Sequence, residues 1–183
     1  MMPEQAKNPV RIVDYDPNWP VVFSRLAAVI KHQLGQAVQS IEHVGSTSVP
    51  GLPAKPIIDL DVVIAEEAEL PQVCALLAEL GYQHQGNQGI EGREAFKRED
   101  ETVPWTEPRA EWMTHHLYVC PANSRELARH LAFRDYLRSH PDARAAYGEL
   151  KQQLAEQYTY DRDGYTEAKT EFISKILQSV LNK

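Results

Sequence analysis

Two aspartates stand inside an apolar run, where their types and spacing suit them to bind a cation. Asp59 and Asp61 lie within residues 57–64. If this run is a strand, both side chains share one face, because alternate residues of a strand point the same way. Buried carboxylates this close repel each other and lose solvation, and a cation such as Mg²⁺ offsets both costs. The pair therefore predicts a metal site. The alternative is a solvated strand edge, which the apolar neighbours disfavour.

A turn of small residues precedes the pair, in the segment HVGSTSVPGL. Gly45, Ser46 and Thr47 can offer backbone N–H groups and two hydroxyls to phosphate oxygens. We expect Ser46 to bind phosphate rather than act as a nucleophile, because no nearby base and acid complete a triad. Lys55 can neutralise either phosphate or the aspartates, or it can lie on the surface. The turn and the aspartates together predict a phosphate-and-metal site.

The two motifs also carry a family resemblance. HVGSTSVPGL followed by AKPIIDLDVVI resembles the GrpB (UPF0157) family, whose Gly-Ser turn and Asp-x-Asp strand are similar to those of the nucleotidyltransferase superfamily. The resemblance continues through DYDP at 14–17, FRDYLR at 133–138 and YTEAK at 165–169. It implies an α/β (α+β) fold with a nucleotidyltransferase-like mixed sheet, flanking helices and a C-terminal helical extension. It implies the fold more strongly than the substrate.

Active nucleotidyltransferases that resemble this pattern add a third carboxylate on a neighbouring strand. The strand expected there reads THHLYV at 114–119 and supplies none. His116 can replace it as a base or metal ligand, since neutral imidazole serves both roles, or it can be a hydrogen-bonded core histidine. Tyr118 stands where relatives more often have histidine. His43 has the same two interpretations and can brace the phosphate turn, while His115 is expected to face away from His116 and to be exposed.

Three basic residues of the helical part also match the family: Arg134, Lys151 and Lys169. Tyr147 and Tyr165 each precede a lysine by four residues, which places ring and ammonium on one helix face. Such a face can stack a base and clamp a triphosphate, with ion pairing to the acidic helices as the alternative. Three more cations are candidates for the same cleft: Arg93, Lys97 and Arg98.

Periodicity and capping signals predict the elements that position these residues. The first part is expected to begin with a helix opened by Asp16, strands at 38–44 and 57–64, and a helix at 65–80. A strand from 82, a turn at 86–89 and an exposed strand at 91–98 should follow. After an irregular stretch at 99–112, a strand at 115–120 should lie beside the Asp-x-Asp strand. Helices follow at 124–140, capped by Asn123 and Glu126, at about 142–158, and from about Thr166 after a loop at 161–164. We expect one domain over 1–183, with an α/β core at about 10–120 and a helical extension at about 121–183.

Composition excludes several classes of function. Nineteen basic against 26 acidic residues give a net charge of −7, which disfavours bulk nucleic-acid binding. A membrane span needs about 18–20 consecutive apolar residues, and no stretch of this sequence is that long. Residues 1–11 lack the apolar stretch of a signal peptide. We therefore expect a cytoplasmic protein without membrane contact. Cys74 and Cys120 form no CxxC motif and are interpreted as structural thiols. The sequence gives no indication of oligomeric state.

These observations predict Mg²⁺-dependent binding of a nucleoside triphosphate and transfer of its nucleotidyl group to an unidentified acceptor. Asp59 and Asp61 would hold the metal, residues 45–47 the phosphates, and Lys151 and Lys169 the triphosphate tail or the base. Two alternatives stay open: a catalytically silent nucleotide-binding module that regulates through partner contacts, and a metal-dependent phosphohydrolase. We also expect Asp59→Asn combined with Asp61→Asn to leave the fold intact while abolishing nucleotide binding.

Overall fold

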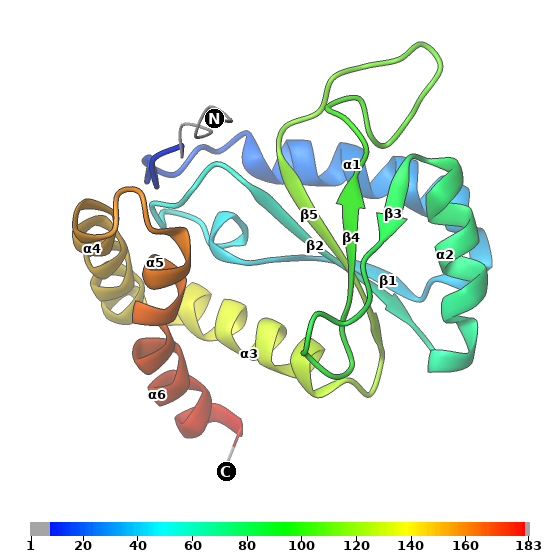
Figure 1. The fold of residues 1–183 in the computed structure, drawn as a ribbon. Coiled ribbons are helices and arrows are strands. Elements are labelled where there is room, and N and C mark those ends of the chain that lie inside the picture. Colours follow the sequence, from blue (N-terminus) through cyan, green and yellow to red (C-terminus); the bar gives the residue numbers. More distant parts are fainter. Residues whose placement is uncertain (1–7, 182–183) are drawn as a thin grey trace, which may run out of the picture.

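The computed structural model describes residues 8–181, so most of the polar N-terminal segment at 1–11 lies outside the described residues. A five-stranded mixed sheet forms its centre, in the order β1-β2-β5-β4-β3 (Figure 1). Strands β2 and β5 are parallel, and every other neighbouring pair is antiparallel. The expected mixed sheet is confirmed, as is the strand beside the Asp-x-Asp strand. The strands are β1 Ser40–Val44, β2 Ile58–Ile64, β3 Tyr82–His84, β4 Glu94–Arg98 and β5 His115–Pro121.

Helices cover both faces of the sheet. The helices α1 and α2 lie on one face, while α3 crosses the other and leads into α4, α5 and α6 at one end of the sheet (Figure 1). The described residues contain no helix that is both long and apolar enough to cross a bilayer. The helices are α1 Trp19–Leu34, α2 Leu70–Glu79, α3 Arg125–Ser139, α4 Pro141–Gln157, α5 Arg162–Ala168 and α6 Thr170–Leu181.

The register of β2 is fixed by its apolar residues. Ile58, Leu60, Val62 and Ile64 are all 0% exposed and pack in one core with residues of α1 and α2. Each such side chain contributes about 1.5–3 kcal/mol when fully buried. A shift of one residue would turn this apolar set away from the core and turn the aspartates into it. Hydrophobic burial therefore directs Asp59 and Asp61 to the α3 face.

Two local predictions in the helical part are wrong. Ser124, not Asn123, caps α3, because its side chain accepts a hydrogen bond from the Leu127 N–H at 3.2 Å. Residues 161–164 were expected to form a loop, yet Asp161 accepts from the Gly164 N–H at 2.9 Å and begins α5. The expected last helix is consequently split into α5 and α6. In both cases the helix begins at a residue other than the one predicted, because the side chain of the N-cap residue accepts a backbone hydrogen bond there.

Candidate functional site

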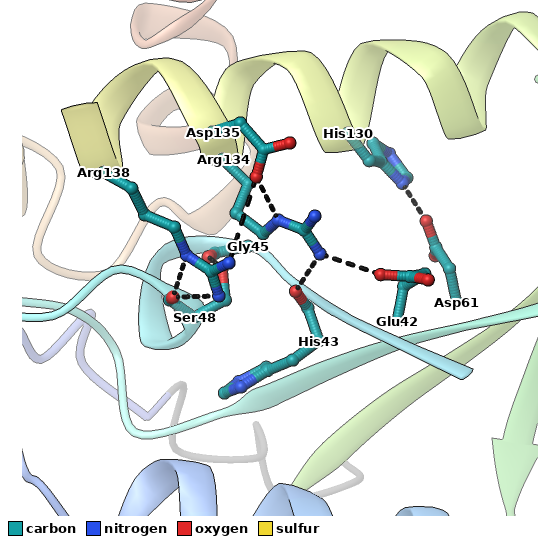
Figure 2. A network of polar contacts seen from close by, with 9 residues as sticks. All are labelled: Glu42, His43, Gly45, Ser48, Asp61, His130, Arg134, Asp135 and Arg138. Atoms are coloured by element: carbon teal, nitrogen blue, oxygen red, sulfur yellow. Dashed lines mark hydrogen bonds and ion pairs between the residues drawn. The ribbon is translucent and has the colours of Figure 1, made fainter. Parts of the chain in front are cut away.

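The two aspartates of β2 lie on the α3 face but in different surroundings. The Asp59 side chain is 27% exposed, and its Oδ1 is 3.0 Å from Nδ1 of His116 on β5. Asp61 is 0% exposed, and its Oδ2 is 2.6 Å from Nδ1 of His130 on α3 (Figure 2). Each aspartate therefore has its own histidine, but a ligand can approach Asp59 more readily than Asp61.

His130 is a site residue that the sequence analysis missed. Burial lowers the pKa of His130, but the hydrogen bond and charge of Asp61 outweigh burial and raise that pKa above its ordinary value. Within the described residues, the second carboxylate oxygen of Asp61, Oδ1, is buried without a hydrogen-bond partner. Replacing Asp61 would disrupt a buried polar pair at a cost of about 1–3 kcal/mol. We therefore expect replacement of Asp61, unlike that of the more exposed Asp59, to destabilise the fold.

Gly45 lies directly against the Asp59 carboxylate. Its φ is +71°, a backbone conformation that favours glycine, and a Cβ built at this position would be 2.2 Å from Asp59 Oδ2. The chain then makes a short 3-10 turn at Ser46–Ser48, in which the Ser48 hydroxyl donates to the Gly45 carbonyl at 2.5 Å. The close approach of backbone to carboxylate requires glycine and brings the turn and the aspartate into one site.

His43 supports this turn from the core side, which confirms that its ring braces the turn. The ring stacks on Phe23 with centroids 4.6 Å apart, and its Nε2 is 2.9 Å from the Thr47 hydroxyl. The Thr47 hydroxyl donates in turn to the Ile57 carbonyl at 3.3 Å, and the residue is 1% exposed. Burial lowers the pKa of His43 to about 4, so the ring is neutral at pH 7. The Thr47 hydroxyl thus has structural partners and does not face a ligand.

Two arginines of α3 hold the backbone on either side of the turn (Figure 2). Arg134 donates through Nη1 to the His43 carbonyl at 3.2 Å and to Glu42 Oε2 at 3.0 Å. Arg138 donates through Nε and Nη2 to the Ser48 carbonyl, at 2.9 and 2.8 Å. Arg134 was predicted to bind phosphate, but its guanidinium has protein partners here, which corresponds to the ion-pair alternative.

Glu42 provides a third carboxylate near the aspartates. It lies on β1 opposite Asp61 in the strand register, so both side chains point to the α3 face. The sequence analysis sought a third carboxylate on the strand that became β5, whereas Glu42 lies on the other neighbour of β2. Because Arg134 pairs with Glu42 and His130 with Asp61, α3 supplies a basic side chain to each of these carboxylates. Asp59 has no such partner on α3 among the described residues.

Three lysines and two tyrosines gather beside the turn, and we call them the lysine cluster: Lys55, Lys151, Lys169, Tyr147 and Tyr165. Nζ of Lys55 and Nζ of Lys169 lie 5.0 and 4.4 Å from the centre of the Tyr165 ring. Nζ of Lys151 lies 4.9 Å from the Tyr147 ring and donates to the Pro53 carbonyl. Tyr147 packs in one apolar cluster with Val49 and Leu52, which follow the turn, and this packing joins the lysine cluster to the turn.

The lysine cluster carries positive charge without a matching carboxylate. Among residues 8–181, none of its lysines makes an ion pair, and Lys151 is 2% exposed. Burial, together with the charges of Lys169 and Lys55, lowers the pKa of Lys151 to about 7. Burial and the charge of Lys55 lower the pKa of Lys169 to about 8, against a smaller opposing effect of Asp59. The fold thus gathers predicted phosphate ligands into a positive region near Asp59.

The neighbouring residues of β5 differ in exposure. His115 faces away from His116 as expected, but the prediction that it is exposed is wrong. It is 3% exposed, with Nε2 2.7 Å from the Tyr82 hydroxyl and Nδ1 2.9 Å from the Met113 carbonyl. His115 faces the core between the sheet and α1 and α2, whereas the side chain of His116 is 48% exposed. The guanidinium carbon of Arg93 lies over the Tyr118 ring, 4.3 Å from the centre of that ring.

Two hollows flank the central strands at opposite ends. The larger, of about 650 Å³, lies where β2 and β5 end, and its lining includes Ile64, Pro121 and Glu126 but none of the predicted site residues. The smaller, of about 350 Å³, opens beside His116, where β4 ends and β5 begins. The larger hollow therefore does not mark the site that the aspartates and lysines define.

The mixed sheet, the glycine turn and the paired aspartates define an α+β protein with a nucleotidyltransferase-like fold. The chain belongs to the GrpB family, whose model, described as GrpB protein, matches residues 9–179. It is 38% identical to a UPF0157 protein of Pseudomonas aeruginosa over 94% of this chain and 68% of that protein. It is 31% identical to the glutamate-rich protein GrpB of Alkalihalophilus pseudofirmus, over 95% and 97% of the two chains.

Solved structures agree with this assignment. The crystal structure of GrpB from Enterococcus faecalis matches with a TM-score of 0.79 and 35% identity, over 94% of this chain and 98% of that chain. A structure of the Cid1 poly(U) polymerase with MgGTP bound matches with a TM-score of 0.53 and 13% identity, over 79% of this chain and 44% of that chain. The second likeness shows the fold alone.

Proposed function

We propose that this protein binds a nucleoside triphosphate with Mg²⁺ and transfers the nucleotidyl group to an acceptor hydroxyl. The lysine cluster is the observation that carries the proposal. Three lysines without carboxylate partners among the described residues lie near one another, beside the turn and Asp59. Buried ammonium groups repel one another, and a ligand with several negative charges relieves that repulsion. A triphosphate supplies such charges in one flexible chain.

The aspartates fit a Mg²⁺ ion that takes its other ligands from the substrate. No group of three or more His, Cys, Asp or Glu within residues 8–181 is arranged to hold a metal. Mg²⁺, however, is commonly held by one or two carboxylates together with substrate phosphates and water. Asp59 is partly exposed, and the buried Oδ1 of Asp61 has no other partner. We therefore expect Mg²⁺ to bind with the nucleotide rather than before it.

The residues have distinct tasks in this reaction. An acceptor oxygen forms a bond to the α-phosphorus, the bond from that phosphorus to the bridging oxygen breaks, and pyrophosphate leaves toward the lysine cluster. Asp59 and Asp61 would hold Mg²⁺, which would neutralise phosphate charge during transfer. His116, held through Nδ1 by Asp59, presents its other ring nitrogen to the acceptor proton. Gly45 and Ser46 position the phosphates from the turn.

A catalytically silent nucleotide-binding module is the second candidate, and two observations favour it. The Asp61 carboxylate is held by His130, and β5 supplies no carboxylate next to Asp59. Saturable nucleotide binding without pyrophosphate release across many acceptors would distinguish this module from an enzyme. Phosphate release without an acceptor would instead indicate a phosphohydrolase.

Calorimetric titration with ATP, GTP, CTP and UTP, each with and without Mg²⁺, tests the proposal. We expect Mg²⁺-dependent binding in the wild type and its loss in Asp59→Asn, with an unchanged melting temperature because Asp59 is partly exposed. Lys169→Met should weaken binding about tenfold or more, since hydrogen bonds to charged groups contribute about 1.5–3 kcal/mol. Lys175→Met is the matched control, because Lys175 is 72% exposed and pairs with Glu171 on α6. Failure of all four nucleotides to bind would overturn the proposal.

A further inference from the structure

The hollow of about 350 Å³ beside His116 lies at the edge of the candidate site. It opens where β4 ends and β5 begins, next to the long loop that connects these strands at the top of Figure 1. His116 belongs to both places, because it lines the hollow and contacts Asp59 at 3.0 Å. We call this hollow the β4–β5 pocket, and its lining includes Phe96, Lys97, Arg98, Asp100, Glu101 and His116.

The sheet order places this pocket across Asp59 from the lysine cluster. Strand β2, which carries Asp59, has β1 on one side and β5 on the other. The lysine cluster adjoins the chain between β1 and β2, because Tyr147 packs on Val49 and Leu52 and Lys151 donates to the Pro53 carbonyl. The β4–β5 pocket adjoins β5. In phosphoryl and nucleotidyl transfer, the attacking and leaving oxygens are roughly in line on opposite sides of the phosphorus. An acceptor must therefore arrive from the pocket side if pyrophosphate leaves toward the lysines.

The charges of the pocket indicate what kind of acceptor fits. The Lys and Arg side chains that line the pocket, Lys97 and Arg98, equal in number its Asp and Glu side chains, Asp100 and Glu101. The Asp100 carboxylate already accepts from the Thr102 N–H at 2.7 Å and the Thr102 hydroxyl at 2.6 Å. Arg98 donates to the Trp112 carbonyl at 3.4 Å. Among the residues that the structure describes, the Lys97 ammonium and the Glu101 carboxylate have no hydrogen-bond or ion-pair partner.

Lys97 and Glu101 are exposed side chains of opposite charge that line one small pocket, and together they complement a ligand that carries both signs of charge. A nucleic-acid end requires instead a row of cations along its phosphates. Nothing in the lining of this pocket forms such a row, and the chain as a whole has a net charge of −7.

We infer that the β4–β5 pocket is the acceptor subsite and that the acceptor is a small hydroxyl-bearing zwitterion. The inference rests on the proposed nucleotidyl transfer. Lys97 binds the carboxylate of the acceptor and Glu101 binds its ammonium. The hydroxyl oxygen then forms the bond to the α-phosphorus and pyrophosphate leaves. The hydroxyl proton passes through the free ring nitrogen of His116 to the water to which the pocket opens.

The test uses the full, isotopically labelled chain saturated with Mg²⁺ and the nucleotide that binds best by calorimetry. L-Serine, L-threonine and L-carnitine serve as zwitterionic probes, glycerol as an uncharged hydroxyl compound, and penta-uridylate as a nucleic-acid end. We expect at least one zwitterion to shift the amide resonances of residues 97–101 and 116, while glycerol and penta-uridylate leave them in place. Lys97→Gln and Glu101→Gln should each weaken binding of that zwitterion about tenfold.

Separate readings of nucleotide and probe binding distinguish the two proposals. Glu101→Gln should leave the nucleotide Kd unchanged, and Lys175→Gln should change neither Kd. Normal nucleotide binding with no pocket shifts from any zwitterion would overturn the acceptor inference and leave the proposed function standing. Pocket shifts from penta-uridylate would overturn it in favour of a nucleic-acid acceptor. Absence of nucleotide binding would overturn both.

Discussion

At the scale of single residues, the lysine cluster makes the ligand-free fold sensitive to pH. The pKa values of Lys151 and Lys169 are lowered to about 7 and about 8, whereas in the unfolded chain both are near the ordinary 10.5. Between these values the unfolded chain binds more protons than the folded chain. The contribution of the two lysines to the free energy of unfolding therefore rises with pH from about 7 to about 10.5.

Nucleotide binding should show the opposite preference. Phosphate favours protonated lysine, so binding raises both pKa values and takes up protons at pH 8, and affinity falls as pH rises from 7 to 9. Calorimetry at pH 8 in buffers with different ionisation enthalpies measures this uptake. Lys151→Met should reduce it, while Lys175→Met should not. A binding enthalpy that is independent of the buffer would contradict the assignment of these lysines to phosphate.

Some neighbours within the site could be predicted from the sequence and others could not. Alternation along a strand is local, so the shared face of Asp59 and Asp61 follows from residues 57–64 alone. His130 and Glu42 lie on other elements, and their approach to Asp61 depends on the crossing of α3 and the register of β1. No pattern within α3 distinguishes His130 from a surface histidine. A search for helix residues spaced four apart with Arg134 and Arg138 would have grouped it with them.

At the scale of elements, α3 positions the phosphate turn through one stripe of side chains. His130, Arg134 and Arg138 are spaced four apart and contact Asp61, β1 and the turn in succession (Figure 2). Since the arginines hold the carbonyls of residues 43 and 48, the turn between them is fixed at both ends. The helix thereby links the position of the turn to that of the buried aspartate.

This linkage predicts that Arg138→Met weakens nucleotide binding although Arg138 touches no nucleotide in the proposed site. Loss of two hydrogen bonds to the Ser48 carbonyl should reduce affinity about tenfold, with a stability cost of about 1–2 kcal/mol. Arg138→Lys should restore part of the affinity, because one ammonium can still donate to that carbonyl. Arg129→Met is the control, since Arg129 pairs with Glu126 on the same helix. Calorimetry and thermal unfolding give both quantities, and an equal affinity loss in the control would argue against a positioning role.

The prediction of elements succeeded where hydrophobic periodicity was strong. The apolar alternation of β2 and the helical spacing of α1 are determined by burial against one core. The short helix α5 has only seven residues and one buried side chain, Tyr165, so periodicity carries little signal there. Its start is set by the single hydrogen bond of the Asp161 cap.

At the scale of the whole molecule, the proposed nucleotide would join segments that are far apart in sequence. The phosphate site takes Ser46 and Lys55 from the sheet part and Lys151 and Lys169 from the C-terminal helices. Figure 1 shows these helices at the end of the sheet where the chain between β1 and β2 lies. The sequence could predict that the helices are present but not where they pack, because that depends on contacts between residues about a hundred positions apart, such as Lys151 and Pro53.

Hydrogen exchange tests this bridging. With nucleotide and Mg²⁺ at 100 times Kd, binding stabilises the folded state by about 2.7 kcal/mol, which slows exchange up to about 100-fold where opening disrupts the site. We expect protection to increase together in residues 45–48 and in α4 to α6. The reference is provided by amides of α2, which lies on the other face of the sheet. Only α2 amides that exchange by local opening are used. Protection confined to residues 45–48 would show that the helices do not take part.

The contact between Gly45 and the Asp59 carboxylate also limits how this protein can change by mutation. A side chain at position 45 would collide with residue 59, so the glycine cannot be replaced while the aspartate remains. Shortening residue 59 first removes the collision but also removes the carboxylate on which the proposed chemistry depends. Substitutions at the two positions are therefore accessible in one order only. In a descendant that loses the activity, the aspartate should disappear before the glycine becomes free to vary.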